Sequence, residues 1–264
     1  GIETIQRSLT QKKINTILDK YGRQDLLIIR HLWEHVYDLE KFTFFIKQLI
    51  NLDGYILFEV PDYSKLLKSY DYTMIWEEHL YYFNKYTFLN SLRKYDFLPI
   101  YSQKIFYPNE DVLLAIVSHK KNIKKNKSET EINKIKFLAS NYRNKFKNQK
   151  KIIKNKLSNI LKKNNRIIFY GGGHLSIAFI LYFNLEKYIS VIIDDNKKKD
   201  GYYIPGTKIK IIHSKKIKFL GNECILVSAN QINEKIMIIN LKKRKILKKN
   251  IFSIFPTSKI YIGH

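Results

Sequence analysis

Short apolar runs that alternate with amphipathic segments constrain the fold of this chain more than any other feature. Residues 26–29 and 55–60 are largely apolar runs of strand length. Between them, apolar side chains repeat at helical spacing, at Phe42, Phe45, Ile46, Leu49 and Ile50, until residues 51–54 stop the pattern. A strand, a helix and a strand in this order predict two parallel strands joined by a right-handed crossover. Pro61 ends the second strand because it has no N–H to donate.

The rest of the first half completes one sheet. Helical patterns cover residues 11–21 and 87–95, and strand patterns cover residues 98–106 and 111–118. The two strands predict a hairpin at the edge of the sheet. Residues 119–127 are almost wholly Lys and Asn, a composition typical of a solvated linker.

The second half repeats the alternation after one long helix. Ser128 and Glu131 have the spacing of a capping box, and an apolar stripe follows them to about residue 161. Strands are predicted at residues 166–170, 190–193, 209–212, 224–228 and 251–254, with helices at about 174–184, 214–219 and 231–242. This pattern predicts a second α/β unit with parallel strands.

A run of three glycines follows the first strand of this second unit. Backbone N–H groups of such a turn can approach an anion at the positive end of the next helix. Asp194 lies 21 residues after Gly173, near the spacing at which a carboxylate holds a ribose hydroxyl. Ser176 replaces the third glycine of that pattern. A tight structural turn explains the glycines equally well, so both interpretations stay open.

Residues 75–83, Ile-Trp-Glu-Glu-His-Leu-Tyr-Tyr-Phe, concentrate more chemistry than any other stretch. Two carboxylates, an imidazole and four aromatic rings suit a site that moves a proton while rings hold a substrate. The structural alternative is a helix end whose charged groups lie at the surface beside core aromatics.

A second histidine-containing stretch follows the first strand of the chain, at the end where open α/β sheets bind ligands. His31 and His35 are four residues apart, a spacing that a helix can use to hold a metal. Because the sequence offers no convincing third ligand, we predict no metal and expect His31 to line a pocket.

Charge and cysteine content limit the classes of function. The net charge is +25 at pH 7, but the basic residues are mostly Lys dispersed among Ile and Asn. Nucleic-acid sites favour clustered Arg, so we expect affinity for anionic small molecules, phosphates included, and no nucleic-acid partner. The single cysteine, Cys224, excludes an internal disulfide. No apolar run reaches the roughly 20 residues of a membrane span. We expect a cytoplasmic protein without membrane insertion, and the oligomeric state stays open.

Several of these motifs resemble those of a known family. Residues 25–36 and 53–61 resemble the middle and later motifs of class I methyltransferases that use S-adenosylmethionine. Residues 75–83 resemble the signature of two-domain sugar C-methyltransferases, which act on nucleotide-linked keto sugars. Residues 194–199 and 201–212 resemble the carboxyl-terminal domain of that family, so the resemblance spans essentially the whole chain.

The resemblance implies an α/β fold with three parts. Residues 1–118 correspond to a partial class I methyltransferase sheet of the Rossmann-like type, residues 119–163 to a basic linker and long helix, and residues 164–264 to a second Rossmann-like domain. The family's glycine-rich cofactor turn and amino-terminal zinc domain would precede residue 1. We therefore expect the carboxyl-terminal part of a larger enzyme, with an incomplete site for S-adenosylmethionine.

The resemblance also assigns catalytic roles. His79 occupies the position of the base that removes a proton beside the substrate's ketone, and the resulting enolate takes the methyl group. A neutral imidazole suits this step because its pKa lies near the working pH. Glu78 is expected to orient His79 or to bind the sugar.

Binding roles follow from the same resemblance. Trp76 and Tyr82 are expected to contact the substrate, although Trp76 lacks the phenol that family members often have there. The substrate is also expected to contact the second domain, at Gly171, Gly173, His174 and Asp194. Arg30 and His31 are expected to contact the cofactor.

Two other functions remain open from the sequence. One is a non-catalytic module that binds a nucleotide sugar, or holds a partner, through the Gly171 turn. The other is a basic protein that binds nucleic acid or a membrane surface, which would show steep salt dependence.

Overall fold

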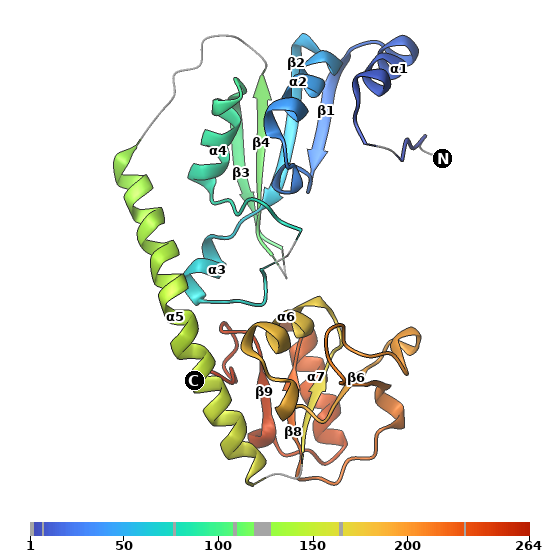
Figure 1. Cartoon of the computed structure of the whole chain (residues 1–264), viewed down its shortest axis with the longest axis vertical. Coiled ribbons are helices and arrows are strands. Elements are labelled where there is room, and N and C mark those ends of the chain that lie inside the picture. Colours follow the sequence, from blue (N-terminus) through green and yellow to red (C-terminus); the bar gives the residue numbers. More distant parts are fainter. Residues whose placement is uncertain are drawn as a thin grey trace. The chain divides into compact units, whose positions relative to one another are not determined.

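The computed structural model describes residues 3–6, 8–75, 78–107, 110–118, 128–163, 166–229 and 231–264 (Figure 1). Contacts divide the chain into two compact units. The first comprises Gly1–Ser64 and Trp76–Asn133, and the second comprises Lys65–Ile75 and Lys134–His264. The division into residues 1–118, 119–163 and 164–264 stays a prediction.

A four-stranded sheet forms the centre of the first unit, with the strands in the order β1-β2-β4-β3. Its strands are β1 (Gln24–Arg30), β2 (Ile50–Pro61), β3 (Leu98–Ile105) and β4 (Val112–Ser118). The predicted parallel pairing of β1 with β2 is confirmed, and so is the antiparallel hairpin of β3 and β4. Residues 51–54 were expected to lie between the helix and the next strand. They belong to β2 instead, because α2 ends at Leu49 and β2 begins at Ile50.

Helices and a large aromatic core support this sheet. The helices are α1 (Gln11–Tyr21), α2 (Leu39–Leu49) and α4 (Lys85–Lys94), and the 3-10 turn η1 (Trp33–His35) follows β1. The capping box that begins α4 is formed by Asn84 and Thr87. Trp33, Phe58 and Phe88 are buried together between the sheet and these helices. The helix α3 (Ser64–Ser69) begins at the point where the chain passes into the second unit.

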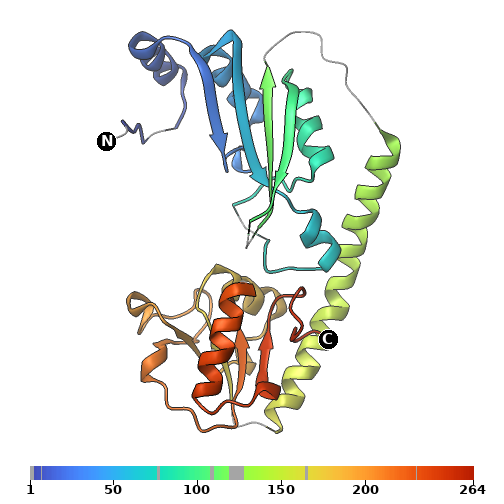
Figure 2. The ribbon, with the colours of Figure 1, turned by 180° about the vertical axis from the view of Figure 1, so that it is seen from behind.

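The second unit contains a five-stranded sheet in the order β7-β6-β5-β8-β9, and every neighbouring pair is parallel (Figure 2). The strands are β5 (Ile167–Tyr170), β6 (Val191–Asp194), β7 (Ile211–His213), β8 (Cys224–Val227) and β9 (Ile251–Ser253). The parallel strands confirm the predicted second α/β unit of the Rossmann-like type. From β5 the chain first adds β6 and β7 on one side of the sheet and then β8 and β9 on the other. Rossmann-like folds bind ligands at the point where the strand order reverses in this way.

Helices cover both faces of this second sheet. Phe169 packs on the face covered by α5 (Glu129–Leu161) and α6 (His174–Phe183), whereas Ile168 packs on the face covered by α7 (Gln231–Lys243). In α5 only Ile153 and Leu157 are buried, so the apolar stripe meets a core in the later turns of the helix.

One predicted helix is corrected. Residues 214–219 form only the 3-10 turn η4 (Ser214–Lys216), because Ile217 adopts an extended backbone. The extended residues let Ile217 and Phe219 pack against the core. Three further 3-10 turns are η2 (Glu186–Tyr188), η3 (Lys197–Lys199) and η5 (Lys248–Asn250).

Candidate functional site

The carboxyl ends of β1 and β2 bring together the first group of candidate residues. The strands are parallel, so the segments that follow them leave the same edge of the sheet. His31 turns the chain out of β1 with a left-handed backbone, φ 47°. The following turn is anchored by Trp33, which is fully buried and whose indole N–H donates to Ser91 Oγ at 3.0 Å. This anchor fixes Glu34 and the residues beside it.

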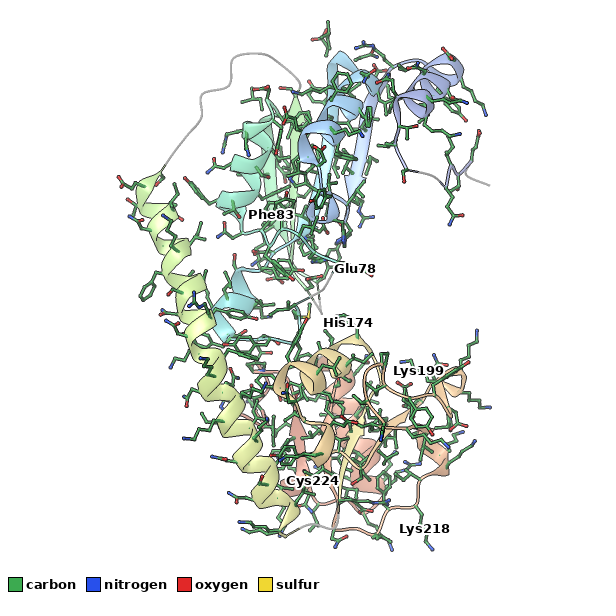
Figure 3. The ribbon with its side chains drawn as sticks, viewed as in Figure 1. Glu78, Phe83, His174, Lys199, Lys218 and Cys224 are labelled. Carbon is green, nitrogen blue, oxygen red and sulfur yellow. The ribbon has the colours of Figure 1, made fainter. Side chains whose placement is uncertain are left out.

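Residues 78–83 are fastened to this edge by main-chain hydrogen bonds (Figure 3, where Glu78 and Phe83 are labelled). The Glu34 carbonyl accepts hydrogen bonds from the backbone N–H groups of Leu80, at 2.9 Å, and of Tyr81, at 3.2 Å. The predicted catalytic stretch therefore lies beside the turn that follows β1, although about 45 residues separate them in sequence.

Tyr63 is held by the turn that follows β2. Its backbone N–H donates to the Phe83 carbonyl at 2.9 Å, which ties the turn to the catalytic stretch. Beneath it, the Lys104 ammonium bridges the carboxylates of Asp62 and Asp111, at 2.7 and 2.9 Å. Side chains from three strand ends thus set the position of the Tyr63 ring.

His79 lies among these groups. Its Nδ1 forms a 2.5 Å hydrogen bond with the Tyr63 hydroxyl, and its ring meets the His35 ring edge-on at 4.5 Å. The Tyr82 ring lies 6.1 Å from the His79 ring and 4.6 Å from the Tyr63 ring. Burial raises the pKa of Tyr63, so its hydroxyl stays protonated at neutral pH. The hydrogen bond with Tyr63 occupies Nδ1 of the His79 ring.

Glu34 is the most deeply placed ionisable group of this site. Its side chain is fully buried, and neither carboxylate oxygen accepts a hydrogen bond from the residues that the structure describes. Burial raises its pKa, while the imidazoles of His35 and His31 act in the opposite direction. One ligand atom from each of Glu34, His35 and His79 lies within 4.8 Å of the others. This arrangement can hold a proton or a cation.

The predicted cofactor residues lie at the rim of the same edge. The Arg30 guanidinium donates twice to Glu59 Oε1, at 3.0 and 2.8 Å, and His31 Nε2 lies 3.2 Å from that oxygen. The Arg30 side chain is 55% exposed. Their role toward a cofactor stays a prediction.

The role of Glu78 in orienting His79 or binding a sugar stays a prediction. Tyr63, and not Glu78, bonds to His79 Nδ1, while the Glu78 backbone carbonyl pairs with His35 Nδ1 at 3.0 Å. Trp76 lies outside the described residues. Sequence reasoning missed Glu110, whose pKa is raised to about 7 by burial and by the charges of Glu34 and Asp111.

The second group of candidates surrounds the glycine turn after β5. The Gly172 N–H donates to Asp194 Oδ2 at 2.8 Å, and the Asn196 N–H donates to Asp194 Oδ1 at 2.8 Å. Lys199 Nζ contacts Asp194 Oδ2 at 3.0 Å and the Gly172 carbonyl at 3.1 Å (Figure 3). Burial disfavours the charged carboxylate, but these donors outweigh it and the pKa of Asp194 is lowered. Asp194 therefore stabilises the glycine turn by accepting a hydrogen bond from its backbone.

The remaining residues of the turn begin α6. Gly171 has φ 104°, and the buried Ser176 hydroxyl donates to its carbonyl. Gly173 is the N-cap of α6, and His174 is its first residue. The four predicted residues Gly171, Gly173, His174 and Asp194 are thus brought together in the second unit, whereas His79 belongs to the first.

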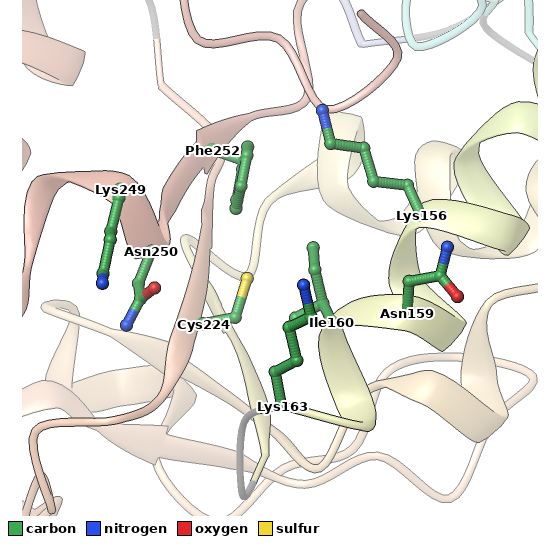
Figure 4. Close-up of a pocket in the computed structure, with 8 residues that line it drawn as sticks. All are labelled: Lys156, Asn159, Ile160, Lys163, Cys224, Lys249, Asn250 and Phe252. Carbon is green, nitrogen blue, oxygen red and sulfur yellow. The ribbon is translucent and has the colours of Figure 1, made fainter.

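A cavity of about 370 Å³ lies elsewhere in the second unit, between α5 and the amino ends of β8 and β9 (Figure 4). Its lining residues are Lys156, Asn159, Ile160, Lys163, Cys224, Lys249, Asn250 and Phe252. Open α/β sheets bind ligands at the opposite, carboxyl end of their strands. Burial raises the pKa of Cys224 to about 12, so the thiol stays protonated. No predicted site residue lines this cavity.

Comparison with known proteins agrees with the architecture. A mixed sheet and a parallel Rossmann-like sheet, with candidate residues at strand carboxyl ends, define an α/β protein of the Rossmann-like methyltransferase class. The family model described as the C-methyltransferase C-terminal domain matches residues 114–256, more than half of the chain. The chain therefore belongs to this C-methyltransferase family. A search of the curated proteins finds no match. Within the described part of the chain, the helices are too short or too polar to cross a membrane.

Proposed function

We propose that this protein is an S-adenosylmethionine-dependent C-methyltransferase that acts on a nucleotide-linked keto sugar or a similar carbohydrate. The supporting observation is the position of His79. Its ring is held by the Tyr63 hydroxyl, beside the Tyr82 ring and at the ligand-binding edge of the first sheet. Membership of the C-methyltransferase family supports the reaction type.

The proposed chemistry begins with proton transfer. In the tautomer in which His79 Nδ1–H donates to the Tyr63 oxygen, the Nε2 lone pair would accept the proton from the carbon beside the ketone. The electron pair of the broken C–H bond moves into the enolate, whose negative charge rests on oxygen. When bound, S-adenosylmethionine would supply the methyl group for that carbon, and its methyl–sulfur bond would break as S-adenosylhomocysteine leaves. The aromatic rings around His79 limit water near the reacting carbon.

The first unit fits only part of a cofactor site. Arg30 and His31 lie at the correct end of β1, and we propose that they contact the cofactor. A glycine-rich turn between a strand and a helix is not among its described residues, because Gly22 precedes β1 and Gly54 lies within β2. The described first unit therefore supplies one side of the cofactor site.

The second unit is proposed to bind the nucleotide part of the substrate. Backbone N–H groups at Gly173 and His174 begin a helix, which favours a phosphate there. Asp194 would contribute by closing the turn, since its carboxylate already accepts the Gly172 and Asn196 N–H groups. The net charge of +25 would attract a diphosphate. The reduced, buried Cys224 suits a cytoplasmic protein.

Deuterium exchange tests the base without requiring methyl transfer. A nucleotide-linked keto sugar incubated with the protein in D₂O, without methyl donor, should exchange the hydrogen beside its ketone, as followed by NMR. His79→Asn keeps a donor for Tyr63 but removes Nε2, so it should slow the exchange by about 10²–10⁴-fold. His264→Asn, in the second unit, should exchange at the wild-type rate.

The outcomes separate the functions. Undiminished exchange by His79→Asn would remove His79 from the role of base. Binding of the nucleotide sugar by the wild-type protein with no exchange above the protein-free rate would instead indicate a non-catalytic binding module.

A further inference from the structure

Glu34 is a buried ionisable residue in the interior of the first unit, and its surroundings suggest a ligand. The carboxylate is fully buried, and within the described chain neither oxygen accepts a hydrogen bond. An isolated buried carboxylate is strongly disfavoured unless it is paired. Glu110 and Tyr63 lie near enough to interact with its charge. Two imidazoles also face it, with His31 Nδ1 at 3.6 Å and His35 Nε2 at 4.0 Å from Oε1. These are ligand atoms as well as proton carriers.

Distances within the cluster suit a shared ion. Bonds from zinc to nitrogen or to carboxylate oxygen are about 2.0–2.2 Å, so two atoms that share an ion lie at most about 4.4 Å apart. Glu34 Oε1 and His35 Nε2 are 4.0 Å apart, within that limit. The ligand atoms of Glu34, His35 and His79 all lie within 4.8 Å of one another, so small side-chain rotations bring all three to one ion.

Both imidazoles are oriented as metal ligands usually are. A histidine that binds a metal through one nitrogen commonly donates the other N–H to a protein oxygen, which fixes the ring. His35 Nδ1 pairs with the Glu78 carbonyl at 3.0 Å, and His79 Nδ1 pairs with the Tyr63 hydroxyl. Each ring would then bind an ion through Nε2.

We propose that Glu34, His35 and His79 form a binding site for a divalent transition-metal ion of the zinc type. Two imidazoles and one carboxylate favour Zn²⁺ or Co²⁺ over Mg²⁺ and Ca²⁺, which prefer oxygen ligands. Three protein ligands leave a fourth position open to water or to a substrate oxygen. This assignment replaces our sequence-based prediction that the chain holds no metal.

Occupation of this site has a consequence that rests on the proposed function. A metal ion and a substrate proton would both use His79 Nε2, so the ion and the proton exclude each other. Zn²⁺ should therefore stop the exchange of substrate hydrogen in D₂O, and a chelator should restore it. If Zn²⁺ accelerates the exchange, the site stands as a metal centre and His79 is not the base.

Binding itself is tested on the full chain without any measurement of activity. Zn²⁺ is titrated in competition with a chromophoric chelator, and Co²⁺ is followed by its visible absorption. We expect about one ion of either metal per chain, with Mg²⁺ showing no binding. Glu34→Gln, His35→Asn and His79→Asn each remove one ligand and keep the local shape, and each should weaken Zn²⁺ binding more than about 100-fold. Tyr63→Phe removes only the orienting partner of His79 and should weaken it about 10–100-fold.

Matched controls keep the test decisive. His264→Asn removes a histidine of the second unit and should bind Zn²⁺ as the wild type does, and circular dichroism checks that every variant is folded. The proposal is overturned if the ligand variants retain wild-type affinity, or if His264→Asn loses as much affinity as they do. Loss of exchange in His79→Asn without metal binding by the wild type would leave the base in place and remove the metal.

Discussion

At the scale of single residues, buried charges in this protein depend on specific donors. Glu223 is fully buried at the beginning of β8 and accepts the N–H groups of Leu220 and Gly221, at 2.6 and 2.8 Å. Arg166 donates to the same carboxylate at 3.0 Å and to the Lys218 carbonyl at 2.7 Å. Burial disfavours the charge, yet the donors outweigh it, and the pKa of Glu223 is lowered.

Glu223→Gln should therefore destabilise the second unit in a pH-dependent way. At neutral pH the loss of the charge-assisted bonds should cost about 1–3 kcal/mol in the free energy of unfolding. Because the folded pKa lies below the unfolded value, the contribution of the carboxylate is fully present above about pH 4.5. It should fade as the pH falls through the folded pKa, which urea unfolding at several pH values measures.

Glu3 provides the control for that measurement. Its pair with Lys20 is exposed on both sides, with 58% and 56% of the side chains accessible. Exposed pairs contribute little, so Glu3→Gln should change stability much less than Glu223→Gln does. Equal effects of the two substitutions would contradict the account of Glu223.

Sequence reasoning located His79 but not its surroundings. The pattern of residues 75–83 predicted a proton-transfer group. His31 and His35 have a spacing that a helix can use to hold a metal, but the sequence offered no third ligand. The structure groups His35, but not His31, with Glu34 and His79, and it places Tyr63 against the His79 ring. No periodicity of a single sequence encodes such pairs, since main-chain bonds between distant segments create them.

At the scale of elements, the turn between β5 and α6 is set by its backbone. Gly171 combines φ 104° with a close approach, since an added Cβ would lie 2.8 Å from the Ser228 carbonyl oxygen. Gly173 has open space around the same position and an ordinary extended backbone, with φ −97°. The first glycine is required by the turn and the last is not.

Substitution by alanine should separate these two glycines. Gly171→Ala should destabilise the protein by about 1–3 kcal/mol or more, because a left-handed backbone is strained for residues with a side chain. Gly173→Ala should cost less than about 1 kcal/mol, the difference between the two residues at an N-cap. Thermal unfolding checks both, and a Gly171→Ala protein as stable as Gly173→Ala would contradict the geometry.

Elements with strong periodicity were predicted well. The helix at residues 11–21 has the predicted ends, and the short apolar runs became strands to within a few residues. The helix expected at 214–219 failed because the core takes Ile217 and Phe219 from an extended chain. Asp194 had the spacing of a ribose ligand, but spacing does not reveal that the Gly172 N–H would already bind it.

At the scale of the whole molecule, positive charge is the dominant property. The chain has 48 basic and 23 acidic residues. Like charges at this density repel one another in the compact state, and dissolved salt screens the repulsion over a Debye length of about 8–10 Å at moderate ionic strength. The excess lies in the second unit, which holds 31 of the 48 basic residues and 7 of the 23 acidic ones, so the repulsion acts mainly there.

The melting temperature should therefore rise with ionic strength. Raising NaCl from about 0.05 to 0.5 M should increase Tm, as measured by differential scanning calorimetry. Choline chloride at equal ionic strength should give the same increase, because screening depends on charge and not on the identity of the ion. A fall in Tm in both salts would show that attractive pairs outweigh the repulsion.

Peptide groups attach residues 78–83 to their neighbours, in addition to the side-chain contact between His79 and Tyr63. The Glu34 carbonyl holds the N–H groups of Leu80 and Tyr81, and the Tyr63 N–H holds the Phe83 carbonyl. Exchange of the side chains along this stretch leaves those attachments intact. The side chains of this loop can accordingly change, by evolution or by laboratory selection, while the loop keeps its place.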